Sequence, residues 1–361
     1  MEILISSLAG GIVGLIVSLI FEEPLTTAKR RFIRWLHTLI YRGHFTARKP
    51  ETFTLGKIIT SWLVIDGDGE LAYTPETIRC RVEDSPVTLP PEIQALYSAI
   101  EQREKAKKDK GQIYLWNGPL YALVSYAIDR TTHYENPGVT FTLRPADYYT
   151  FQATVMSLDQ NLLKPPANLT LRQKYLQTQD LTRPIPFLAN GFGVTLVVIT
   201  GDRKLILSRR QDVTGARVGE LDASIAEGVH PVLDRSSKYR GPDLYRTAIR
   251  GAQEELGIAL VEDEITFLGF GVDTEYYQWG MLGVAQLSDL SEHVLKNRTR
   301  GTGGKWEIRK IEVIDSDPRV VLNYIRQEKI WATGLVAIYW ALVHEYGKKR
   351  VDAIAREVFG W

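Results

Sequence analysis

The sequence predicts an α/β (α+β) protein in which a mixed sheet with flanking helices follows an N-terminal α/β segment and one membrane helix. Three observations support this. Residues 193–211 contain two β-prone runs around a turn, which is typical of a hairpin. A helix with apolar residues at helical spacing runs from the capping residue Asp243 to Gly257. Residues 3–21 carry no charge.

Those nineteen residues, from Ile3 to Phe21, form the predicted membrane helix because a rise of ~1.5 Å per residue nearly crosses a ~30 Å hydrocarbon core. A signal peptide or a core helix is the alternative, but no basic segment precedes the stretch and no clear cleavage site follows it. Basic residues follow it within residues 22–44, so the positive-inside rule places residue 22 onward in the cytoplasm. Within this juxtamembrane segment, residues 28–41 are expected to form a helix that lies at the headgroups or continues the anchor helix. The lone Cys80 agrees with a reducing compartment.

Small residues recur every fourth position within the predicted anchor and define one helix face. Such a stripe lets two membrane helices approach closely, so it predicts a homo-oligomer. Ordinary membrane-helix composition is the equal alternative, because glycine and serine are common there. The stripe consists of Ser6, Gly10, Gly14 and Ser18.

The overall charge excludes a general attraction to polyanions. The chain has 361 residues, with 44 Lys and Arg against 43 Asp and Glu, so no nucleic-acid polymer is expected as a partner. The six histidines show no paired metal-ligand spacing, and no zinc site is expected.

Residues 45–183 form the predicted N-terminal α/β part. Short β-rich runs fill residues 53–82, and Pro90-Pro91 begins a helix whose charged end, Glu101 to Gly111, extends into solvent. Apolar segments at residues 118–127 and 140–143 follow, and the sequence RPADYYT stands at residues 144–150. The predicted domain boundary is near Pro184.

Residues 184–346 form the second predicted domain, and residues 347–361 a C-terminal tail. Strand-like runs at residues 265–272 and 280–287 follow the capped helix. The glycine-rich residues 300–306 lack the spacing of a phosphate loop. Residues 330–343 are uncharged but too few to span a membrane, which predicts a buried core helix.

The end of the capped helix reads Arg250-Gly-Ala-Gln-Glu254-Glu255-Leu-Gly257-Ile258 and resembles the Nudix box. In that family the helix glutamates hold magnesium against a diphosphate, which implies Glu254 and Glu255 as metal ligands and as the residues essential for catalysis if the chain is active. A surface acidic pair, with Arg250 reaching Glu254 at i+4, is the alternative.

Two positions depart from the box. Gly251 stands at the place of its first glutamate, and the loop-side glutamate, expected eight residues before Arg250, falls on Pro242. Asp243 is only a partial substitute. Gly228 begins the box and a long insertion follows it. Because two carboxylates are absent, the sequence favours binding over hydrolysis.

A membrane helix, an α/β segment and a degenerate box in this order resemble the SMODS-associated Nudix domain family, transmembrane effectors of bacterial anti-phage signalling. The resemblance implies a cyclic nucleotide ligand, antiviral defence, a single-pass location in the bacterial inner membrane, and an anchor that impairs this membrane. A magnesium-dependent hydrolase of nucleoside diphosphate derivatives and an inert scaffold are the alternatives.

Candidate ligand contacts lie beside the hairpin and in the region between the two strand-like runs. A pair of arginines could bind phosphate, although such pairs are often only solvated. Three aromatic side chains could stack on a base, although such clusters more often belong to a core. These candidates are Arg209, Arg210, Tyr276, Tyr277 and Trp279.

Overall fold

The computed structural model describes residues 52–85, 87–129, 137–160, 169–177, 179–209, 219–298 and 310–360. Residues Pro50–Trp361 make one compact unit, separate from Met1–Lys49. The predicted anchor, its small-residue stripe and the juxtamembrane segment lie outside the described residues. Within the described ranges, no helix combines the length and apolar character needed to cross a bilayer.

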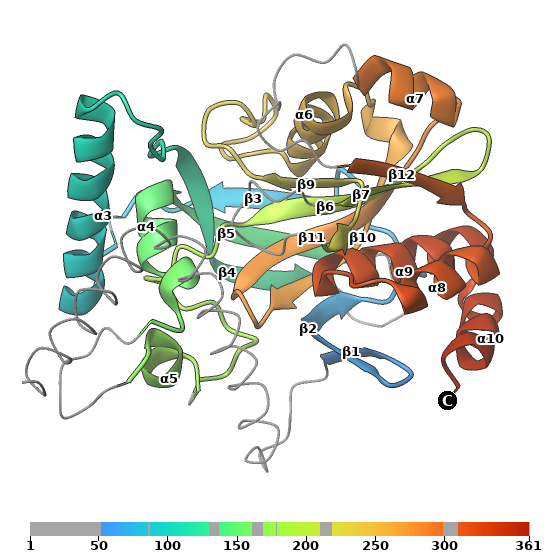
Figure 1. The fold of residues 1–361 in the computed structure, drawn as a ribbon, viewed down its shortest axis with the longest axis horizontal. Helices are drawn as coiled ribbons and strands as arrows, with labels where there is room; N and C mark the ends of the chain where they lie inside the picture. The colour runs from blue at the N-terminus through green and yellow to red at the C-terminus, as the bar shows by residue number, and fades with distance from the viewer. Residues whose placement is uncertain are drawn as a thin grey trace, which may run out of the picture. The chain divides into compact units, whose positions relative to one another are not determined.

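One large mixed sheet of nine strands organises the compact unit (Figure 1). Strand β11 runs parallel to β6, and the other neighbours are antiparallel. Strands β8 (Leu221–Asp222) and β9 (Ile225–Gly228) extend it beside β7 and β6. The order along the sheet is β1 (Thr52–Leu55), β2 (Ile58–Gly67), β10 (Ile265–Asp273), β11 (Gln278–Gln286), β6 (Gly193–Ile199), β7 (Lys204–Arg209) and β12 (Lys310–Asp315).

Each face of this sheet borders its own hydrophobic core. Along β6, Val194 and Leu196 belong to one core, whereas Val197 and Ile199 belong to the other. Successive strand residues point to opposite faces, so a continuous apolar run serves a sheet covered on both sides. The predicted hairpin and the mixed sheet with flanking helices are confirmed.

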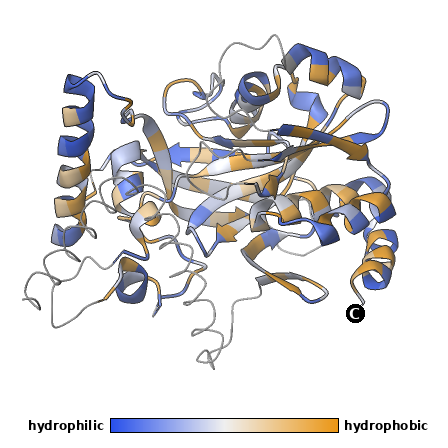
Figure 2. Cartoon of the chain, in the orientation of Figure 1, coloured by the Kyte–Doolittle hydropathy of each residue, from blue (hydrophilic) through white to orange (hydrophobic). Residues whose placement is uncertain are grey.

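The second core is covered by α9 (Ala332–Tyr346), which lies between α8 (Pro318–Gln327) and α10 (Lys348–Phe359) in sequence. Figure 2 shows α9 as largely hydrophobic, and its residues from Gly334 to Val343 are buried. The prediction of a buried core helix is therefore confirmed. Helix α10 occupies most of residues 347–361, which the sequence predicts to be a C-terminal tail.

The opposite face carries helices and a second, smaller sheet. Helix α6 (Leu244–Leu256) contacts β9 and β6 and is followed by the short helix η3 (Glu262–Glu264), while α7 (Ser291–Arg298) lies against α6 (Figure 1). A second sheet, in the order β3 (Ile78–Val82), β5 (Gly138–Asp147), β4 (Pro119–Asp129), borders the same core. Its Phe141 ring lies 5.1 Å from Phe270 of the large sheet.

The helical elements that accompany the small sheet in the sequence precede the predicted boundary at Pro184. They are α3 (Pro91–Asp109), α4 (Tyr148–Ala153), η1 (Val155–Ser157) and α5 (Leu171–Tyr175). The boundary does not separate two sheets by sequence, because β2 pairs with β10 in the large sheet. Strands from both sides of Pro184 thus belong to one unit.

The buried residue Asn190 joins the small sheet to the segment that leads into β6. Its Oδ1 accepts from the backbone N–H of Leu123 at 2.8 Å, and its Nδ2 donates to the Leu123 carbonyl at 2.9 Å. The amide therefore takes the place of a neighbouring strand at β4. Nearby, the Phe192 N–H donates to the Tyr121 carbonyl at 2.9 Å and extends the junction.

We expect Asn190→Ala to lower the free energy of unfolding by about 2–3 kcal/mol, because both polar groups of Leu123 would be left buried without their partner. Asn323→Ala is the matched control, since Asn323 is exposed on α8 and should change stability by less than ~0.5 kcal/mol. Urea titration measures both. An equal effect of the two substitutions would contradict a structural role for Asn190.

Candidate functional site: the Arg250 network on helix α6

Helix α6 forms where its local sequence predicts it. Asp243 caps the first turn by accepting from the Tyr245 N–H at 3.0 Å, and Gly257 ends the helix with a left-handed φ of 69°. A side chain at Gly257 would be strained in that conformation. The apolar face of the helix is buried against the sheet and holds Arg250 towards β9.

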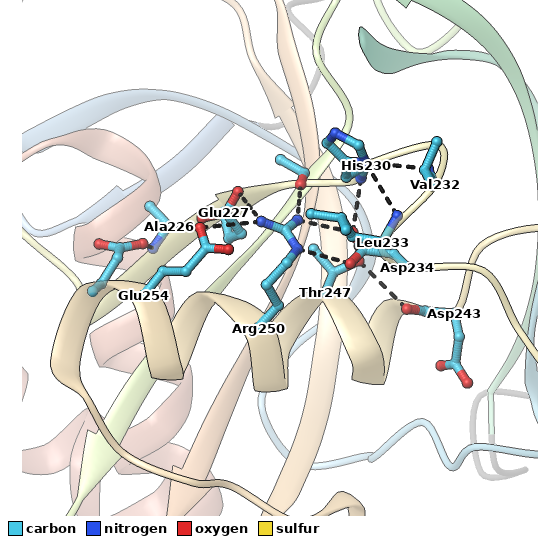
Figure 3. A network of polar contacts seen from close by, with 12 residues as sticks. Ala226, Glu227, His230, Val232, Leu233, Asp234, Asp243, Thr247, Arg250 and Glu254 are labelled. Carbon is cyan, nitrogen blue, oxygen red and sulfur yellow. Dashed lines mark hydrogen bonds and ion pairs between the residues drawn. The ribbon is translucent and has the colours of Figure 1, made fainter. Parts of the chain in front are cut away.

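Arg250 is the centre of a polar network between α6, β9 and the loop after β9 (Figure 3). Its Nε and Nη2 donate to the two carboxylate oxygens of Asp234 at 2.8 and 2.9 Å. Its Nη1 lies 2.9 Å from Glu227 Oε1 and 3.4 Å from Glu254 Oε2, and Nη2 also donates to the Gly228 carbonyl at 2.8 Å. Burial opposes the charge of Arg250, but the Asp234 and Glu227 carboxylates outweigh it and raise the Arg250 pKa.

Asp234 is the fully buried member of this network. Besides Arg250, it accepts from the His230 N–H at 2.7 Å and from the Thr247 hydroxyl at 2.9 Å. A buried carboxylate is tolerated only with such pairing. The ion pair between Asp234 and Arg250 therefore holds the loop after β9 on helix α6.

Asp234 could not be predicted from the sequence because residues 235–242 form an excursion. The Asp243 N–H donates to the Asp234 carbonyl at 2.7 Å, and Arg235 bridges Pro242, so the ends of the excursion meet. Asp234 lies sixteen positions before Arg250, and the excursion accounts for eight of them. Without it, Asp234 stands eight residues before Arg250, where the Nudix resemblance expects a carboxylate. The excursion thus offers Asp234 as an alternative to Pro242 for that position, and the residues KYRGP mark the excursion in the sequence.

The second departure, Gly251, has a steric reason. A Cβ at Gly251 would lie 2.8 Å from Glu227 Cβ and 2.9 Å from Ile225 Cγ2. Helix α6 thus approaches β9 too closely for a glutamate there. The carboxylate of Glu227 contacts Arg250 from the strand instead. Burial raises the Glu227 pKa, and the attraction of Arg250 only partly offsets this rise.

Glu254 and Glu255, the glutamates of the predicted box, differ in their surroundings. The Glu254 side chain is 46% exposed, and its contact with Arg250 has the i+4 geometry of the structural alternative. Glu255 Oε1 accepts from the Ala226 N–H at 2.8 Å and joins the end of α6 to β9. In the described part of the chain, no three acidic, histidine or cysteine side chains converge as a metal site. The carboxylates, as arranged, do not fit a magnesium ion held by several of them.

Arg209, predicted to bind phosphate, is held by carboxylates. Its Nε lies 2.6 Å from Glu312 Oε1 on β12, and its Nη2 lies 2.9 Å from Glu328 Oε2. The guanidinium stabilises the edge of the sheet, so phosphate binding there would require these ion pairs to open. Arg210 lies outside the described residues.

The three predicted stacking residues are buried, with 7%, 0% and 2% of Tyr276, Tyr277 and Trp279 exposed. The Tyr277 hydroxyl donates to the Arg183 carbonyl at 2.9 Å and accepts from the Ile185 N–H at 3.1 Å. These rings pack in or beside the core, which agrees with the alternative that such aromatic clusters belong to a core. A base-stacking role stays a prediction and would need the core to open.

We expect Arg250→Ala to lower the free energy of unfolding by about 3–5 kcal/mol, because Asp234 would remain buried as an uncompensated charge. Arg246→Ala removes the same side chain from an exposed position of α6 and should cost less than ~0.5 kcal/mol. Thermal or chemical unfolding compares the two. Equal stability of both variants would show that the Arg250 network does not hold the loop.

Glu227→Gln tests the raised pKa of Glu227. A raised pKa means that the folded state favours the protonated form, so this group contributes stability below its ordinary value of 4.5 that is lost as the pH rises through the folded pKa. The wild type should therefore gain stability relative to Glu227→Gln as the pH falls from 7 to 4. Urea titrations at each pH measure this difference. A difference that shrinks over the same range would contradict the raised pKa.

Comparisons with known proteins leave the family open. No family model matches the chain, and no curated protein matches it. Among 12 matching chains of solved structures is DR0079 from Deinococcus radiodurans, determined at 1.9 Å resolution. It is 18% identical to this chain, covers 41% of it and 80% of its own length, and has a TM-score of 0.29. A similarity at this level supports no argument about fold or function.

Proposed function

We propose that the chain is a membrane-anchored effector whose cytosolic, Nudix-like domain binds a cyclic nucleotide in antiviral defence and acts through its transmembrane segment by impairing the inner membrane. The observation that supports binding over hydrolysis is the arrangement around Arg250. Its guanidinium engages Asp234, Glu227 and Glu254, so acidic groups in the place of a metal site hold the helix and loop together.

The Nudix part of the proposal is supported by the order of elements and by Asp234. The β6–β7 hairpin precedes the Gly228 loop, and α6 carries Arg250, Glu254 and Glu255 before its Gly257 stop. With the excursion removed, a carboxylate stands at the expected loop position. A scaffold of this kind can bind a phosphate ester without cleaving it once its metal ligands have other partners.

The membrane part of the proposal is supported by the sequence of residues 3–21 and by the basic residues that follow. Those features favour a single-pass protein with a cytosolic compact unit, and the stripe from Ser6 to Ser18 favours a homo-oligomer. Ligand binding that changes the contacts between compact units would then alter the packing of the anchors.

A magnesium-dependent hydrolase of nucleoside diphosphate derivatives is the second candidate. One observation favours it: Glu254 is partly exposed on a rigid helix, where a carboxylate is well placed to bind a cation. The absence of a glutamate at position 251 opposes it, because Gly251 lies against Glu227 and Ile225.

The decisive experiment separates binding from turnover. We expect residues 50–361 to bind a member of a cyclic di- and trinucleotide panel in calorimetry, and to release no phosphate from nucleoside diphosphates with magnesium. Combined Glu254→Gln and Glu255→Gln substitutions should leave this affinity within about threefold, since a sensor needs no metal there. Glu262→Gln with Glu292→Gln removes the same charge elsewhere and is the control.

Magnesium-dependent turnover that disappears only in the Glu254 and Glu255 variant, without any cyclic nucleotide bound, would overturn the sensor and favour the hydrolase. If residues 50–361 show neither binding nor turnover, the inert scaffold is the remaining candidate.

A further inference from the structure

Four consecutive apolar residues are exposed where the chain leaves helix α3. Ile113 is 88% exposed and Trp116 68%, while Tyr114 and Leu115 are exposed by 39% and 37%. Single exposed apolar residues are ordinary, but a contiguous group indicates a contact surface. We refer to residues 113–116 as the apolar segment.

The backbone of this segment is held in place by buried groups. The Leu115 N–H donates to Glu104 Oε2 at 2.8 Å, and the Tyr149 hydroxyl donates to the Leu115 carbonyl at 2.8 Å. The Glu104 side chain is fully buried and is neutralised by Arg103 at 2.7 Å and Lys107 at 3.2 Å. Both backbone groups of Leu115 are therefore fixed, and the apolar side chains are presented to solvent in an ordered arrangement.

Basic side chains border the apolar segment. Residues 101–110 contain five basic and three acidic residues, although the whole chain has a formal net charge of only +1. Lys105, Lys108 and Lys110 are exposed, and Lys108 Nζ lies 5.6 Å from the centre of the Tyr114 ring. Figure 2 shows the C-terminal turns of α3 as hydrophilic. The surface thus combines a local excess of positive charge with exposed aromatic and aliphatic groups.

We propose that the apolar segment and the lysines at the end of α3 dock onto an anionic lipid surface. Trp and Tyr rings prefer the boundary between headgroups and acyl chains, where Trp116 and Ile113 would insert. The lysines would lie among lipid phosphates, and each adds attraction to an anionic leaflet. Charge and apolar contact here come from adjacent residues, as interfacial binding requires.

The small area of the apolar segment favours a lipid surface over a protein partner. A stable protein interface needs ~800 Å² on each side, and four side chains, two of them less than half exposed, supply far less. A bilayer needs no complementary patch, because it adapts to a small wedge. The contact rests neither on the proposed nucleotide ligand nor on the predicted anchor, and it would set the orientation of the compact unit on the membrane.

The test uses residues 50–361, which contain both cores and lack the predicted anchor. We expect this unit to float with vesicles of phosphatidylcholine and phosphatidylglycerol, and much less with phosphatidylcholine alone. Ile113→Ser with Trp116→Ser should lower the partition coefficient about tenfold or more. Ile59→Ser is the matched control, because Ile59 is 71% exposed in β2 and should leave binding unchanged.

Lys108→Glu with Lys110→Glu is the second variant and should abolish only the preference for anionic vesicles. Circular dichroism checks that each variant is folded. The proposal is overturned if the wild-type unit binds neither vesicle, or if the Ile113 and Trp116 variant floats as the wild type does. It is equally overturned if that variant instead converts a dimer to a monomer, since the surface would then bind a second copy.

Discussion

The ion pair between Arg250 and Asp234 determines the arrangement of the site. A fully buried carboxylate is unstable without a partner, so the loop after β9 stays where the guanidinium reaches it. The same guanidinium reaches Glu227 on β9, and it therefore joins α6 to β9. The close approach of α6 to β9 excludes a side chain at Gly251. A glutamate at position 251 would therefore meet Glu227 and Ile225.

This arrangement links stability to function. In a metal-dependent hydrolase the acidic side chains must converge on a cation, and their mutual repulsion is relieved only when the cation binds. In this chain the cation among the carboxylates is Arg250, which contacts Asp234, Glu227 and Glu254. The proposal of a sensor depends on this difference.

The two ways in which the chain is proposed to meet a membrane have different physical origins. The predicted anchor depends on apolar length alone, since a helix satisfies its own backbone in a bilayer. The apolar segment at residues 113–116 depends on tertiary structure, because Glu104 and Tyr149 hold Leu115 in place. An anchor restricts the compact unit to the membrane surface, whereas a second contact restricts its orientation. The orientation of the compact unit matters where two copies must associate through matching surfaces.

The sequence by itself determined elements whose signals are local: the Asp243 cap and Gly257 stop of α6, the β6–β7 hairpin and the buried helix α9. Only the tertiary structure decided which distant segments meet, since loop length and strand pairing are not written in local periodicity. It joined β2 to β10 across the predicted boundary at Pro184. It also brought Asp234 to Arg250 across an eight-residue excursion, which a count along the chain could not anticipate, because only the folded loop brings its two ends together.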